Sequence, residues 1–193
     1  KKLRQDTQFE LMDIQETTGT TFVIVTHDQE EAMTVASRVA VMDEGRIIQV
    51  STPAAIYEYP NSVYVADFIG DVNIIEGAAR TDGDRIALDW AEGQPPVYGH
   101  GHAPTGQRLS LAIRPEKITI STEKPDGAAN ALQGHVHDIA YLGNLSTYHV
   151  RLANGDILKA QTANTRRISR RAFTWEDPVW ISWTDTAGVV LEG

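Results

Sequence analysis

Hydrophobic and polar positions follow different periods in the two parts of this chain. Near the start, Leu3, Leu11 and Ile14 lie at roughly helical spacing, and the segment stops at residues 17–19 (TTG). Residues 21–25 (TFVIV) then form a continuous apolar run, which is typical of a strand buried on both faces of a parallel sheet. The opening pattern therefore predicts a helix followed by a strand of an α/β sheet.

Local signals predict the elements that come next. Asp28, followed three residues later by Glu31, resembles a capping box at the start of a helix. Residues 43–46 (DEGR) stand between two apolar runs and predict a hairpin with a four-residue loop. Residues 53–70 favour helix again, with a break at Pro60.

Beyond residue 72 the period changes to two. Short runs alternate apolar and polar residues and are separated by turn-forming Gly, Pro, Asn and Asp, the pattern of half-buried strands. These runs are residues 86–90, 109–113, 148–152 and 179–183. Residues 92–106 carry several Gly and Pro and predict an exposed loop. We therefore expect an α/β fragment over residues 1–72 and an all-β barrel or sandwich over residues 73–193.

Composition narrows the classes of protein. The 193 residues are 41% hydrophobic and 22% charged, an ordinary globular balance, and the apolar runs are too short to span a bilayer. The formal net charge of −9 disfavours nucleic acid as a partner. Because the chain has no cysteine, disulfides and thiolate metal sites are excluded.

The first residues suggest that part of the α/β domain precedes this sequence. The chain opens with KKLR, without Met and without an apolar signal core. Some fifty residues with one buried strand are too few to cover both faces of a parallel sheet. The expectation is that the rest of this α/β domain lies upstream.

Three segments carry a resemblance to a known family. Residues 21–32 (TFVIVTHDQEEA) resemble the switch-histidine segment of ABC transporter ATPases, and residues 37–47 (SRVAVMDEGRI) resemble the hairpin that follows it. Residues 111–116 (LAIRPE) resemble a signature of the C-terminal accessory domain of importer subunits, an OB-like, TOBE-type barrel. Within the importers, the spermidine/putrescine type is most similar, on residues 141–143, 148–151 and 189–191, and sugar importers come next.

The resemblance gives His27 a role. In that family the matching histidine contacts the γ-phosphate of ATP and senses hydrolysis, so His27 is the one catalytic and cofactor-binding residue that the resemblance assigns. A neutral imidazole can donate a hydrogen bond to a phosphate oxygen. ATP and Mg²⁺ are the cofactors implied for the parent protein. No Gly-x-x-x-x-Gly-Lys-[Ser/Thr] occurs in the sequence, so the chain alone is expected neither to bind ATP tightly nor to hydrolyse it.

Partners and location also follow from the resemblance. It implies membrane permease subunits as partners, a place on the cytoplasmic face of the membrane, and a homodimer held through the accessory domain. Residues 22–25 have an apolar edge that invites pairing with another chain. We therefore expect partner chains to cover the N-terminal segments, or those segments to rearrange.

Other candidate residues have weaker support. His135 and His137 share one face of a predicted strand and could form a metal pair, but no third ligand is evident. His100 and His102 lie in the Gly/Pro-rich loop, where they could bind adventitious metal. A further set comprises the tryptophans near the end, which could stack a ligand or pack in the core: Trp175, Trp180 and Trp183.

Two other functions remain open. The barrel could be a regulatory module that binds a small oxyanion, with Arg114 among its donors. The other available donors form one basic cluster: Arg166, Arg167, Arg170 and Arg171. An OB-type nucleic-acid binder is the third reading, and the negative charge argues against it.

Overall fold

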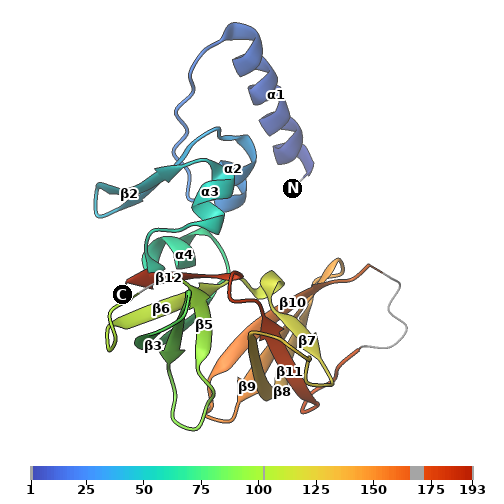
Figure 1. Cartoon of the computed structure of the whole chain (residues 1–193). Helices are drawn as coiled ribbons and strands as arrows, with labels where there is room; N and C mark the ends of the chain where they lie inside the picture. Colours follow the sequence, from blue (N-terminus) through green and yellow to red (C-terminus); the bar gives the residue numbers. More distant parts are fainter. Residues whose placement is uncertain (1, 102, 166–171, 193) are drawn as a thin grey trace.

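The computed structural model describes residues 2–101, 103–165 and 172–192. Figure 1 shows a small N-terminal part of helices and one hairpin, which stands on a larger body built of strands. We call residues 73–192 the β body.

The N-terminal part consists of short, capped elements. They are α1 (Lys2–Thr18), α2 (Gln29–Val35), β1 (Val39–Asp43), β2 (Arg46–Ser51), α3 (Pro53–Glu58) and α4 (Val63–Ile69). Asp28 caps α2 by accepting a hydrogen bond from the Glu31 amide, as the capping pattern predicted. The β1–β2 loop has two residues and not four, because Glu44 and Gly45 both have positive φ, at 45° and 76°. That conformation permits the tightest hairpin turn.

The prediction of a buried strand at residues 21–25 is wrong for the chain as it stands. The segment has no regular secondary structure, and Val23 and Val25 are 89% and 96% exposed. In the described part of the chain every paired strand is antiparallel, and none lies beside this segment. A parallel strand exists only with neighbours on its edges, so an apolar run without them remains an irregular, exposed segment.

The β body contains two five-stranded antiparallel sheets. In chain order the elements are β3 (Asn73–Asp82), β4 (Arg85–Asp89), β5 (Val97–His100), β6 (Arg108–Ile113), η1 (Pro115–Lys117), β7 (Thr119–Ser121), β8 (Asn130–Tyr141), β9 (Leu145–Leu152), β10 (Ile157–Ala163), β11 (Pro178–Trp183) and β12 (Gly188–Glu192). One sheet has the order β12-β6-β3-β4-β5, and the other has the order β7-β11-β8-β9-β10. The predicted OB-like, all-β architecture is therefore present, as two curled sheets.

The two sheets have the same strand order because the β body is an internal repeat. The first unit runs from β3 to β7 and the second from β8 to β12. In each unit the fifth strand leaves its own sheet and completes the other one: β7 pairs with β11, and β12 pairs with β6. Each sheet is therefore incomplete without a strand of the other unit.

The same Asn-x-x-x-Gly pattern opens both units. Asn73 and Asn130 are buried, and each side chain bonds the backbone of the edge strand in the opposite sheet. Asn73 accepts from the Lys159 amide at 2.7 Å and donates to the Lys159 carbonyl at 2.9 Å. Asn130 makes the equivalent pair with Tyr98, at 2.7 and 3.0 Å. The two amides thus satisfy edge-strand groups that would otherwise lack partners.

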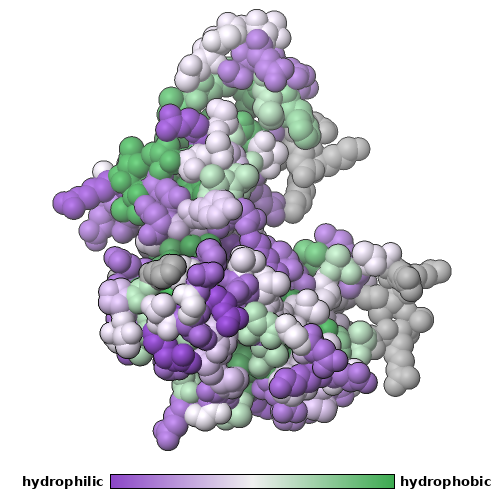
Figure 2. All heavy atoms as spheres, viewed as in Figure 1, coloured by the Kyte–Doolittle hydropathy of each residue, from purple (hydrophilic) through white to green (hydrophobic). Residues whose placement is uncertain are grey.

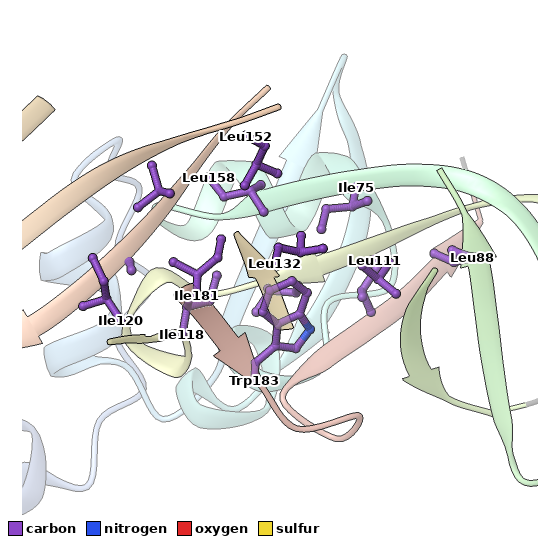
Figure 3. Packing of buried hydrophobic residues seen from close by; sticks show 14 of the residues in the cluster. Ile75, Leu88, Leu111, Ile118, Ile120, Leu132, Leu152, Leu158, Ile181 and Trp183 are labelled. Carbon is purple, nitrogen blue, oxygen red and sulfur yellow. The ribbon is translucent and has the colours of Figure 1, made fainter. Parts of the chain in front are cut away.

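The main core lies between the two sheets and draws on both units. Figure 3 shows Trp183 beside Leu132 and Ile181, with Leu111 and Ile75 from the other sheet close by. A second cluster sits within the N-terminal part, around Ile56 and Val65. The prediction that residues 92–106 form an exposed loop is wrong in part, since these residues include β5, whose Val97 is fully buried. The strand has only four residues and lies among Gly and Pro, so its alternating pattern was not recognised.

Arg114 holds the N-terminal part to the β body. It follows β6 directly and is only 4% exposed. Its Nη1 donates to the carbonyls of Ala66, Gly70 and Asp71 at 2.9, 2.9 and 3.1 Å, which terminate α4. The guanidinium also lies 4.2 Å from the centre of the Tyr57 ring. A cation at the carbonyl end of a helix is favourable, and here it fixes where α4 sits.

Three polar pairs surround this arginine, and together with it they form what we call the junction. The Tyr57 hydroxyl donates to Glu116 at 2.5 Å, and Lys117 pairs with Glu58. Lys159 pairs with Asp71 at 2.8 Å. Burial, followed by the hydrogen bond to Glu116, raises the pKa of Tyr57 far above its ordinary value of 10.0.

Arg114→Met should loosen the junction without unfolding the β body. The variant leaves the carbonyls at the end of α4 without their charged donor, a loss of about 2–3 kcal/mol, or roughly 30- to 150-fold faster amide exchange. Hydrogen exchange read by mass spectrometry over residues 53–70 measures it. Arg108→Ala, which removes a side chain that is 80% exposed, is the control and should leave exchange unchanged. Equal exchange in both variants would contradict this role for Arg114.

Tyr57 should make the junction sensitive to alkali. With its pKa raised in the folded protein, the unfolded chain loses this proton first, so stability is intact below about pH 10 and falls as pH rises further. We expect Tyr57→Phe to be less stable than wild type at pH 8 by about 1 kcal/mol, with the gap closing towards pH 11.5. Thermal unfolding followed by circular dichroism tests this, and parallel pH curves for the two proteins would refute it.

Candidate functional site

His27 lies in a turn that local hydrogen bonds hold in shape. The Asp28 amide donates to the Thr26 hydroxyl at 2.9 Å, and that hydroxyl donates to the Glu31 carboxylate at 2.7 Å. With Asp28 capping α2, these bonds fix the residues on both sides of His27. The histidine itself is exposed. The sequence-predicted turn therefore forms even though the strand before it does not.

This turn can supply one neutral donor or acceptor to a ligand, and not a complete site. A nucleotide phosphate needs several backbone N–H groups and a cation around it. The first turn of α2 instead carries Glu30 and Glu31. The chemistry of these residues fits one contact to a phosphate oxygen from the His27 imidazole, with the remaining donors coming from other segments.

The other histidines do not form a metal centre within the described residues. His135 and His137 lie on β8, but the register shifts between Val136 and Asp138, so a β-bulge separates them. His100 ends β5 and is exposed, whereas His102 lies outside the described residues. Across residues 2–101, 103–165 and 172–192, no three His, Cys, Asp or Glu side chains come together as metal ligands.

The arginines offered as oxyanion donors divide into two groups. Arg114 is not available, because its guanidinium is buried against backbone carbonyls at the junction. The members of the basic cluster, Arg166, Arg167, Arg170 and Arg171, lie outside the described residues. Arg114, the only one of these proposed donors within the described residues, is therefore not free to bind an oxyanion.

The three tryptophans have different environments. Trp183 is buried in the core, as the packing alternative predicted, and Trp175 is about half exposed. Trp180 is half-buried on the outer face of β11, where the Lys124 ammonium lies 5.3 Å from its ring centre.

Trp180 lines a concave groove that sequence reasoning missed. We define the groove by its lining: Gly93, Gln94, Pro95, Pro96, Tyr98, Lys124, Ala128, Ala129, Ala131, Gln133, Gly134, His135, Arg151, Leu152, Ala153 and Trp180. These residues come from β5, β8, β9, β11 and three loops, which no local pattern brings together. The repeated Asn-x-x-x-Gly was the available signal, since it shows that the two units can be compared position by position.

Among the helices that the structure describes, none has both the length and the apolar content needed to cross a lipid bilayer.

Comparison with known proteins gives the relationship. Residues 111–191 match the TOBE domain family. The putrescine transport ATP-binding protein PotG of Escherichia coli (strain K12) is 43% identical over 99% of this chain and 52% of its own length. The spermidine/putrescine import ATP-binding protein PotA of Thermobifida fusca (strain YX) is 40% identical over 100% of this chain and 50% of its own length. The chain thus spans about half the length of the relatives it matches.

A solved structure shows the same fold at low identity. The cytoplasmic molybdate-binding protein ModG, in a crystal form with molybdate bound, superposes with a TM-score of 0.53 and 10% identity. The match covers 63% of this chain and 96% of that protein. At this identity the likeness concerns architecture alone.

The family match and the structural match both concern an all-β architecture. Residues 111–191 match the TOBE domain family, and the chain is similar over nearly all of its length to about half the length of ATP-binding proteins named for polyamine transport and import.

Proposed function

We propose that this chain forms the C-terminal half of the ATP-binding subunit of an ABC import system for polyamines. The observation that carries the proposal is the match of 43% identity over 99% of the chain to a putrescine transport ATP-binding protein. Relatives at 40% and 38% identity are named for spermidine/putrescine import. Polyamines are favoured over sugars as the solute because these names give polyamines.

The proposed division of labour follows the two parts of the chain. Residues 1–72 would complete the ATPase domain, and residues 73–193 would form the accessory domain. In the complete subunit, bound ATP with Mg²⁺ supplies the phosphoryl group that is cleaved. His27 would donate a hydrogen bond to a phosphate oxygen, held in place by the turn that Thr26, Asp28 and Glu31 build.

The proposed partners are the membrane permease subunits and a second copy of this subunit. The relatives' names describe import, which requires a permease, and this supports a place on the cytoplasmic face of the membrane. The accessory domains are the proposed contact between the two copies.

Exposed apolar side chains in the N-terminal part support further contacts there. Figure 2 shows a hydrophobic area over the β1–β2 hairpin, where Met42, Ile47 and Val50 are exposed. Val23 and Val25 extend the exposed apolar surface. A surface of this kind marks a contact with other protein, here the rest of the ATPase domain or a partner chain.

A chimera tests the proposed function. It joins this chain to the remaining portion of the Escherichia coli relative, of which the chain covers 52%. In cells lacking that relative, the chimera should restore uptake of labelled putrescine. His27→Ala should lower ATP turnover and uptake by roughly a hundredfold, because one donor to the developing phosphate charge is lost.

Two controls accompany the chimera. His100→Ala alters an exposed histidine at the end of β5 and should leave uptake unchanged. The 193-residue chain alone should release no phosphate from ATP. Full uptake by the His27→Ala chimera would refute the proposed contact between His27 and a phosphate oxygen. ATP hydrolysis by the chain alone would refute the proposal that ATP hydrolysis needs the other half of the subunit.

Self-association of the chain alone should depend on its exposed apolar segment. Val23→Ser combined with Val25→Ser removes the two most exposed valines named above. Sedimentation velocity should show dimers or larger species for the wild type and a shift towards monomer for the double variant. A wild-type monomer at all concentrations would count against the proposal that another chain covers Val23 and Val25.

A further inference from the structure

The internal repeat allows the outer faces of the two sheets to be compared position by position. In the first unit, Asn73 pairs across the sheet with Ile113, and in the second, Asn130 pairs with Trp183. Counting along the strands from these pairs, Ala131 corresponds to Ile74 and Ser182 to Ala112. Trp180 corresponds to Ser110 by the same count. These positions lie on or beside the outer faces of β3 and β6 in one sheet and of β8 and β11 in the other.

A helix covers part of the outer face of the first sheet. Ala66 of α4 packs with Ala112 and Leu191, and Val63 and Ile74 lie at the edge of this apolar cluster. Figure 1 shows α4 lying against β6 and β12. The equivalent face of the second sheet is the open groove around Trp180.

The second face is not suited to another apolar helix. A serine replaces Ala112 in the equivalent position, and the smaller Ala131 replaces Ile74. A large ring replaces Ser110, with Gln133 opposite Trp180 in the next strand. The helix on the first sheet makes apolar contacts in addition to the Arg114 hydrogen bonds, whereas the second face offers an aromatic plane and hydrogen-bonding groups.

The walls of the groove are fixed by contacts outside its floor. The Trp90 indole donates to the Pro95 carbonyl at 3.0 Å, which ties down the loop on one side. Asn130 bonds both backbone groups of Tyr98, and the Arg85 guanidinium lies 4.5 Å from the centre of that ring. A groove held in this way is largely formed before a ligand arrives.

The charge of the groove is opposite to that of the chain. Its lining contains Lys124, His135 and Arg151 and no Asp or Glu among the described residues, whereas the chain carries a formal net charge of −9. Glu176 pairs with Arg151 at 3.2 Å from outside the lining. Lys124 is therefore the main charge within the groove, and it stands over the Trp180 ring.

From this geometry we propose that the groove binds a small organic anion with a flat ring, of the aromatic carboxylate class. The ring would lie beside Trp180 and against the small side chains of Ala129 and Ala131, and its carboxylate would meet the Lys124 ammonium that stands over the indole. Gln133 would supply a hydrogen bond. The site is on the second repeat unit alone, because Ser110 and Glu76 stand on the first unit where Trp180 and Gln133 stand on the second.

Benzoate is the probe that tests this site in the full 193-residue chain. Titration followed by NMR should shift the Trp180 indole N–H signal and leave that of the buried Trp183 in place. Lys124→Ala should weaken benzoate binding by about three- to tenfold, as expected for a partly exposed charge contact. Arg108→Ala removes an exposed positive charge on the other sheet, and binding should stay within a factor of two of wild type.

Two matched probes separate the charge from the ring. Benzamide has the same ring without the charge and should bind several-fold more weakly than benzoate. Inorganic phosphate has the charge without the ring and should leave the Trp180 signal nearly unmoved. Trp180→Phe keeps a flat surface and should retain benzoate binding, reported by the Gln133 amide signals. Equal binding of benzoate and benzamide, or an unchanged affinity in Lys124→Ala, would overturn the proposal.

Discussion

A single buried guanidinium decides how the two parts of this chain are placed. Burying a charge is costly unless it is well compensated, and Arg114 is compensated by three carbonyls at the end of α4 and by the Tyr57 ring. A lysine could not reproduce the planar arrangement of donors. Because the acceptors are backbone groups at one end of α4, the contact fixes the orientation of that helix as well as holding it to the β body. The position of α4 over β6 follows from it, and with it the covering of the first sheet.

The exchange of fifth strands makes the two repeat units interdependent. β7 and β12 each complete the sheet of the other unit. The side chains of Asn73 and Asn130 each bond the edge strand of the opposite sheet. Neither unit can bury its core without the other, so the units can diverge on their outer faces while the inner faces stay matched. That is the pattern observed: equivalent inner positions such as Ile75 and Leu132 remain apolar, whereas one outer face receives a helix and the other is an open groove.

Local patterns predicted local structure well and long-range structure poorly. The helix cap at Asp28 depends on residues three positions apart, and it forms. The hairpin was placed correctly, but its loop was predicted too long, since the positive φ of Glu44 cannot be read from its residue type. The role of Arg114 was missed because its acceptors lie more than forty positions earlier. The groove was missed for the same reason, since Tyr98, Gln133 and Trp180 meet only through the sheet order.

The segment before His27 has the composition of one structure and adopts another. Its apolar run has the composition of a buried parallel strand, yet Val23 and Val25 are almost fully exposed. The turn after it needs no neighbour: its bonds among Thr26, Asp28 and Glu31 are made within six residues, so it forms regardless. A strand depends on partners for every backbone group on its edges, whereas a cap depends on one side chain. His27 is therefore held in a formed turn, while a sheet that would include the segment before it is absent from the described residues.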